Sequence, residues 1–149
     1  MSQTPPTPYE QFGGAAFFES LAAAFYRRVE TDEVLRPMYP EGDLAPAQRR
    51  LQMFLEQYWG GPQTYNEERG HPRLRMRHVP FPIDSDARDR WLKHMYDSID
   101  EQGMDPELES MLWMYLVQAA FAMQTIPDGT PPGTPYPPPE WGTDQTEAP

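Results

Sequence analysis

Hydrophobic positions recur every three or four residues in several separate stretches of the chain, which is the spacing of α-helices with one buried face. The first stretch follows Gly13-Gly14 and runs to about Glu30. The second starts at Asp43 through Pro46, a capping acid with proline in the first turn, and ends at Gly60-Gly61-Pro62. The residues expected to face the core here are Phe17, Phe18, Leu21, Ala24, Phe25, Val29, Leu51, Phe54, Leu55 and Tyr58.

Two further helices are expected in the C-terminal half of the chain. Asp84 or Ser85 caps the first, and Gly103 closes it. Asp105-Pro106 begins the second. Their buried sides carry Trp91, Leu92, Met95 and Ile99, and then Leu108, Met111, Leu112, Tyr115, Leu116, Ala119, Ala120 and Met123. Since no alternating strand pattern competes, the predicted fold class is all-α with four main helices.

The segments between these helices are less regular. One short helix fits between Glu33 and Met38. Residues 63–83 show no sustained period, and a helix of two turns at most fits between Pro72 and Pro80. This irregular stretch carries two of the three histidines, His71 and His78.

Composition indicates a folded domain at residues 9–126 with disordered extensions at residues 1–8 and 127–149. The C-terminal extension holds 8 of the 19 prolines, four acidic residues and neither Lys nor Arg. A polyproline ligand at Tyr136–Pro139 is the alternative to a plain disordered tail.

Charge and cysteine content exclude several classes of function. A net charge of −11 repels phosphate backbones and anionic lipids, so neither nucleic acid nor membrane is an expected partner. The absence of cysteine excludes disulfides, thiol catalysis and thiolate metal sites. No apolar run approaches the roughly 20 residues that span a bilayer, and the N-terminus lacks signal-peptide features. A cytoplasmic location is therefore expected.

Four arginines form a basic patch on this acidic background, around His71 and His78. They are Arg69, Arg73, Arg75 and Arg77. The patch suggests a small anionic partner, and the alternative is a solvated Arg-rich loop.

His78 is the candidate metal ligand. Pro80 and Pro82 stop the short helix just beyond it and leave the last carbonyls, including that of Leu74, without helical partners. Such a carbonyl can accept the Nδ1–H of the ring and direct Nε2 at a metal. Zinc is disfavoured, because three histidines with neither an HExxH motif nor cysteine offer a poor ligand set. Arginines nearby could pair with the propionates of a haem, and a structural or surface histidine is the alternative.

Tyr26, Tyr39 and Trp91 are large side chains with a polar end, predicted near a common core. If all three face one cavity, they offer hydrogen-bond donors to a partly negative ligand such as dioxygen. The alternative is that each merely packs and donates to a carbonyl or to water.

The chain resembles a known family, the group II truncated haemoglobins, which are small globins with a two-over-two helical sandwich. The resemblance covers about Tyr9 to Ile126. It is carried by the blocks Phe12–Gly14, Phe25–Tyr26, Val34–Pro40, Arg50–Pro62, Tyr65, Arg69–His78 and Arg90–Leu92.

The resemblance implies a role for individual residues. His78 would be the axial ligand of haem b iron. Tyr39 and Trp91 would donate to the bound gas, with Tyr26 beside them and the small Ala47 leaving a gap near the iron. The porphyrin faces would be lined by Leu51, Phe54, Leu74, Phe81 and Met95. The candidates for contact with the propionates are Arg50, Tyr65, Arg75 and His71. His94, three residues after Trp91, is expected at the surface.

The expected function is reversible binding of O₂, CO or NO at ferrous iron, with slow release caused by the Tyr and Trp donors. The alternative is a haem enzyme with peroxidase or NO dioxygenase activity that needs a reductase. A third hypothesis, a haem-based sensor whose tail recruits a partner, has no signalling domain to support it.

Overall fold

A computed structural model describes residues 5–39, 42–78 and 81–131 of the chain, with the side chains of residues 74 and 75 excepted. All regular structure within these residues is helical, which confirms the all-α prediction. The elements are α1 (Pro8–Phe12), α2 (Gly14–Val29), the 3₁₀ helix η1 (Arg36–Met38), α3 (Ala45–Tyr58), α4 (Thr64–Arg69), α5 (Leu74–His78), α6 (Ser85–Glu101) and α7 (Pro106–Met123).

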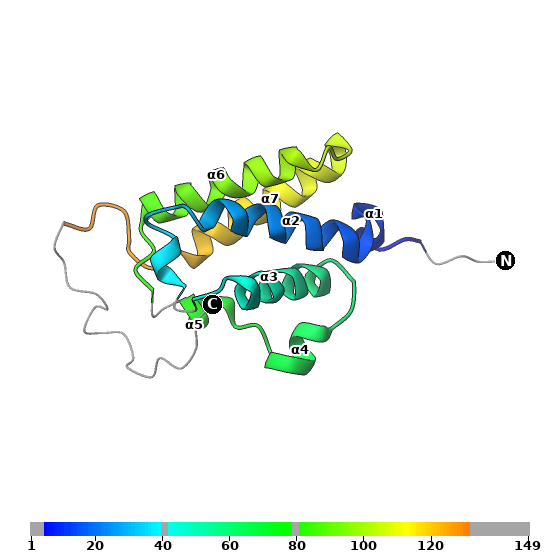
Figure 1. Ribbon diagram of the computed structural model, residues 1–149, viewed down its shortest axis with the longest axis horizontal. Coiled ribbons are helices and arrows are strands. Elements are labelled where there is room, and N and C mark those ends of the chain that lie inside the picture. Colours follow the sequence, from blue (N-terminus) through cyan, green and yellow to red (C-terminus); the bar gives the residue numbers. More distant parts are fainter. Residues whose placement is uncertain (1–4, 40–41, 79–80, 132–149) are drawn as a thin grey trace.

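The four long helices form two packed pairs. Helix α2 packs on α3, α6 packs on α7, and the pairs meet because α2 also contacts α6 (Figure 1). Figure 1 also shows that α5 lies near the end of α7, which places it beside the two pairs rather than within them.

The long helices begin and end close to the predicted positions. Asp84 caps α6 by accepting a hydrogen bond from the backbone N–H of Ala87, at 2.8 Å. Asp105 caps α7 through the N–H of Glu107, at 2.9 Å. These bonds satisfy donors that the first turn of a helix leaves without partners. The side chains buried most completely between the pairs are Phe18, Leu21, Phe25, Val29, Leu55, Met95, Leu112 and Leu116.

Two short helices, α1 and α4, were not predicted. Helix α1 takes in Pro8, the last residue of the N-terminal segment expected to be disordered. Its cap is Thr7, whose hydroxyl accepts the backbone N–H of Glu10 while the Glu10 carboxylate accepts the N–H of Thr7. Helix α4 buries Tyr65. Both are too short for their apolar residues to show a helical period.

Two predicted burial states were wrong. Tyr58, expected on the buried stripe of α3, is 51% exposed, because it lies at the last turn and stacks on the outside of Tyr115. His94, expected at the surface, is partly buried and hydrogen-bonded to the buried Asp32.

None of the helices in the described part of the chain is long and apolar enough to cross a membrane. Residues 132–149, most of the predicted C-terminal extension, lie outside the described residues, as do Pro40 and Pro80.

Candidate functional site

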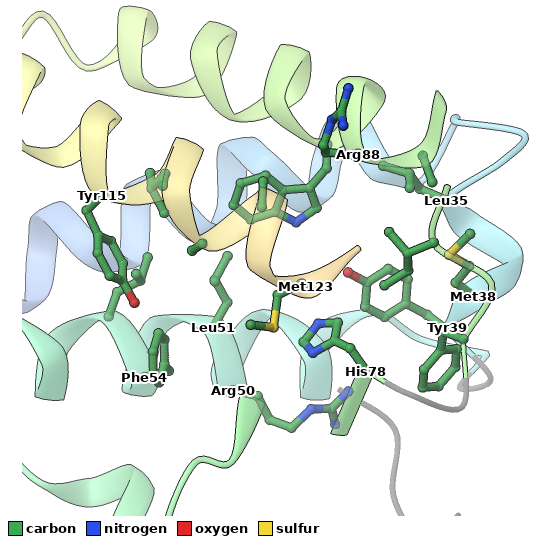
Figure 2. Close-up of a pocket in the computed structure, with 18 of the residues that line it drawn as sticks. Leu35, Met38, Tyr39, Arg50, Leu51, Phe54, His78, Arg88, Tyr115 and Met123 are labelled. Atoms are coloured by element: carbon green, nitrogen blue, oxygen red, sulfur yellow. The ribbon is translucent and has the colours of Figure 1, made fainter. Parts of the chain in front are cut away.

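A cavity of about 1070 Å³, counting the space that opens to solvent, lies between the helix pairs (Figure 2). Its walls come from α3, α4, α5, α6, α7, from η1 with its flanking residues and from the segment that follows α5, and most of them are hydrocarbon or aromatic. The lining residues are Leu35, Met38, Tyr39, Arg50, Leu51, Phe54, Leu55, Tyr65, His78, Phe81, Ile83, Ala87, Arg88, Trp91, Tyr115, Leu116, Ala119, Ala120 and Met123.

His78 is the last residue of α5 and points its ring into this cavity (Figure 2). The chain after it is tied to the end of α7. Thr125 donates its hydroxyl to the carbonyl of Phe81 and accepts the backbone N–H of Ile83 at 2.8 Å. The backbone N–H of Thr125 donates to the carbonyl of Ile83 at 2.9 Å. These hydrogen bonds hold residues 81–83 against the segment that follows α7, so this wall of the cavity depends on long-range packing.

Part of the basic patch has a structural use on the N-terminal side of His78. The guanidinium of Arg77 donates to the carbonyl of Pro72 at 2.7 Å and to that of Arg69 at 3.1 Å. These bonds brace the link between α4 and α5. His71 is exposed, does not line the cavity, and accepts the backbone N–H of Arg73 at 3.2 Å.

Tyr39 and Trp91 line the same cavity as His78, from the segment after η1 and from α6. Figure 2 shows the Tyr39 hydroxyl directed into the cavity near the His78 ring. Tyr26 is buried behind Tyr39 and donates to its hydroxyl oxygen at 3.4 Å, with the two rings edge to face. The Trp91 ring packs against Phe25 at a centroid distance of 5.3 Å.

The remaining predicted site residues divide into three groups. Arg50, Leu51, Phe54, Tyr65 and Phe81 line the cavity. Ala47 and Met95 are buried in the core but do not line it, although each shares a helix face with a lining residue one turn away. The side chains of Leu74 and Arg75 lie outside the described residues.

Several lining residues were not predicted, and Arg88 is the most unusual. Its side chain is 11% exposed, lies 4.1 Å from the centre of the Phe121 ring, and donates to the Gln124 amide oxygen at 2.8 Å. Figure 2 shows its guanidinium turned away from the cavity, so its stem lines the wall. Its position three residues before Trp91 on α6 is the signal that identifies it.

A buried carboxylate, Asp32, connects the segments that carry Tyr39 and Trp91. One oxygen accepts the backbone N–H groups of Val34 and Leu35 at 2.8 and 2.9 Å. The other lies 2.7 Å from Nε2 of His94, and Arg90 lies 3.4 Å from the carboxylate. Burial alone raises the pKa of Asp32, but the hydrogen bonds from His94, Leu35 and Val34 and the charge of Arg90 lower it to about 2.

The lining residues fit a haem. The broad hydrocarbon walls match a planar apolar ring system, and His78 is the single imidazole among the described lining residues. Arg50 lies below the His78 ring in Figure 2, where a cation can meet a carboxylate at the edge of such a group. Tyr39 and Trp91 add two hydrogen-bond donors to the same space.

Comparison with known proteins agrees with this geometry. A family model described as bacterial-like globin matches residues 7–125. Among curated proteins, a group 2 truncated haemoglobin of Bacillus subtilis is 42% identical over 113 residues, which cover 76% of this chain and 84% of that protein.

Solved structures give the same result. A thermostable haemoglobin from the actinobacterium Thermobifida fusca is 56% identical, with a TM-score of 0.81 over 83% of this chain and 100% of that one. A truncated oxygen-avid haemoglobin from Bacillus subtilis is 39% identical, with a TM-score of 0.75 over 80% of this chain and 99% of that one. The chain therefore belongs to the bacterial-like globin family and, within it, to the group II truncated haemoglobins.

Proposed function

We propose that this protein is a haem b protein that binds O₂ reversibly at ferrous iron, accepts CO and NO as alternative ligands, and releases O₂ slowly. Membership of the globin family implies haem-based binding of a diatomic gas. The proposal of O₂ binding with slow release rests on one observation, that His78, Tyr39 and Trp91 line one largely apolar cavity. The similar Bacillus subtilis structure is named an oxygen-avid haemoglobin, which supports tight binding here.

In this proposal His78 holds the haem through Nε2 of a neutral imidazole. A bound haem would supply the iron that takes up the gas. Leu51, Phe54 and Phe81 would hold the apolar ring system, and Arg50 and Tyr65 would hold its propionates. Contacts from Leu74 and Arg75 stay predictions from the sequence. We assign Met95 and Ala47 a supporting role behind the walls, because both are buried without lining the cavity.

Slow release follows from two donors in a space with few competing polar groups. With a haem bound, the indole N–H of Trp91 and the hydroxyl of Tyr39 would be available to donate to the partly negative gas ligand. The hydroxyl of Tyr26 lies 3.4 Å from the Tyr39 hydroxyl oxygen and helps to hold this side chain in place beside the cavity. In a poorly solvated cavity the loss of such a bond costs about 1–3 kcal/mol. A protein with this retention is better suited to oxygen chemistry than to oxygen transport.

Replacing Trp91 by Phe tests this function. The Trp91→Phe variant keeps an aromatic ring but loses the donor, so we expect O₂ dissociation, measured by stopped flow, to be about tenfold faster or more. Trp113→Phe is the matched control, because Trp113 packs on Tyr96 and does not line the cavity. An unchanged off-rate in Trp91→Phe rules out its proposed role.

An enzymatic function is the second candidate, favoured by the convergence of Tyr39 and Trp91 on one space. With a haem bound, these two donors would be placed to stabilise the charge that develops when the O–O bond of a peroxide breaks. Among the described lining residues no second histidine is available as an acid–base group, so we expect peroxidase turnover to be slow. NO dioxygenase turnover would need a reductase.

Steady-state consumption of peroxide and of NO, each with and without a supply of electrons, separates this enzyme from a simple binder. Turnover faster than the spontaneous reactions would favour the enzyme. A cytoplasmic location and the exclusion of nucleic acid and membrane partners stay predictions from the sequence.

A further inference from the structure

We propose that the solvent-facing side of α5, with Met76 at its centre and Arg73 at its rim, is the docking surface for an acidic electron-carrier protein. The partner is a small iron–sulfur or flavin carrier whose redox group is surrounded by carboxylates. This inference rests on the proposed function, because the haem must be held at His78, and it adds the place where electrons enter.

Helix α5 is a thin wall between the cavity and solvent. His78 points its ring into the cavity (Figure 2), while Met76, two residues earlier on the same helix, is 66% exposed. Two residues correspond to about 200° around an α-helix, so these side chains leave α5 on nearly opposite sides. A protein that contacts Met76 is therefore only about one helix diameter, roughly 10 Å, from the residue that would hold the haem.

The surface around Met76 has an apolar centre and a basic rim. Met76 is the most exposed of the large apolar side chains in the described part of the chain. Arg73 and His71 are exposed beside it, and residues 69–78 contain four arginines and no acidic residue. Electron-transfer complexes are small and weak, and complementary charge around the contact speeds and orients the encounter.

Arg73 carries a charge that the rest of the described chain does not neutralise. Its backbone N–H donates to the His71 ring, but no carboxylate of the described residues forms an ion pair with its guanidinium. Most other basic side chains do have such a partner. Those that form an ion pair within the described residues are Arg27, Arg28, Arg49, Arg88, Arg90 and Lys93.

The charge of the whole chain restricts the kind of partner. A net charge of −11 repels an acidic protein from most of the surface, so attraction is confined to the basic patch and fixes the orientation of the encounter. An extended phosphate polymer would continue from the patch onto acidic surface, whereas a compact carrier contacts the patch alone. These two effects favour a small acidic protein.

Both candidate functions need a supply of electrons, since the gas binds to ferrous iron and oxidation of the iron ends that binding. The exchange balances with two reactants. The carrier loses one electron and is oxidised, and ferric iron gains that electron and becomes ferrous. No proton and no other reactant is required.

The sign of the salt effect is the test. The full chain, loaded with ferric haem, is mixed in stopped flow with a reduced plant-type [2Fe–2S] ferredoxin. If docking occurs at the patch, the second-order rate of haem reduction falls severalfold between about 10 mM and about 0.2 M salt, because salt screens the attraction. If the net charge governs the encounter, the rate rises with salt, and the proposal is overturned. Titration calorimetry with oxidised ferredoxin measures the same binding without electron transfer.

Two pairs of variants locate the surface. Arg73→Glu should slow the reduction and weaken the binding severalfold. Lys93→Glu makes the same change of charge at a side chain that is 70% exposed on α6, which Figure 1 shows above α7 while α5 lies below it, and should have little effect. Met76→Ala should also weaken the binding severalfold. Met114→Ala, at a methionine that is 63% exposed on α7, should leave it unchanged.

The outcomes separate the docking surface from the proposed function. Absence of a Soret band overturns both. If haem binds and O₂ is released slowly, but Arg73→Glu and Lys93→Glu behave alike, the docking surface alone is wrong. Reduction by photoreduced lumiflavin, a small neutral donor, should be equally fast in every variant, and a slower rate in Arg73→Glu would attribute its effect to a changed haem site. If Arg73→Glu fails to hold haem, the comparison of Met76→Ala with Met114→Ala decides.

Discussion

At the scale of single residues, Asp32 orders the side of the cavity that carries the proposed gas-binding donors. It caps the turn that leads into η1 and Tyr39, and it holds His94, which lies one helical turn after Trp91 on α6. The sequence alone predicted His94 at the surface, because spacing along a helix shows which residues share a face but not which distant residue that face meets. Its partner is 62 positions away, and such a pairing depends on how α2 and α6 pack.

We predict that Asp32→Asn destabilises the protein at neutral pH and that the effect disappears in acid. The carboxyl pKa is lowered from 3.8 to about 2 on folding, so the ionised group contributes stability above pH 3.8 that is lost as the pH falls through about 2. A lowering of nearly two pKa units corresponds to about 2.5 kcal/mol. Asn keeps the size and can still accept the backbone N–H groups, but it loses the charge facing His94 and Arg90.

Urea unfolding between pH 7 and pH 2 measures this difference in the free energy of unfolding. Asp43→Asn is the control, since Asp43 is exposed and likewise accepts a backbone N–H, that of Ala45. A difference between wild type and Asp32→Asn that stays constant over this range would contradict the electrostatic account.

At the scale of elements, the length of a helix decides whether the sequence predicts it. The four long helices each contain several turns, so their apolar periodicity is visible and their capping residues confirm the ends. Helices α1 and α4 have 5 and 6 residues, and their formation depends on tertiary contacts. The backbone N–H of Tyr9 in α1 donates to the carbonyl of Trp59 at 2.8 Å, a contact that local sequence does not indicate.

At Gly61, just after α3, the chain lies close against Tyr9 of α1. A Cβ atom there would lie 2.5 Å from a ring carbon of Tyr9 and 2.8 Å from the carbonyl oxygen of Glu56. We therefore predict that Gly61→Ala forces α1 away and costs about 1–3 kcal/mol, visible as a lower Tm. Gly42→Ala is the control, because a Cβ atom at Gly42 meets nothing within 4 Å. Equal Tm values for the two variants would show that this close approach is unimportant.

At the scale of the whole molecule, the two helix pairs bring residues from distant parts of the chain to one cavity. The chemistry of the side chains already made His78, Tyr39 and Trp91 candidates, and the family resemblance added most of the other predicted lining residues. Arg88 and Tyr115 were missed as lining residues, because the rotation of α6 and α7 about their axes is fixed only by packing. Met95 shares a face of α6 with Trp91 but lies one turn further along the helix, where it packs in the core rather than on the cavity.

The account depends most on His78 as the residue that holds haem. The direct measurement is a haemin titration of the full chain followed by visible absorption, with ferric, dithionite-reduced and CO-bound spectra. We predict a Soret band that saturates at one haem per chain, poor haem retention and loss of the normal ferrous spectrum in His78→Ala, and wild-type spectra in His71→Ala, whose side chain is exposed outside the cavity. No Soret band in the native chain, or native spectra in His78→Ala, would contradict the account.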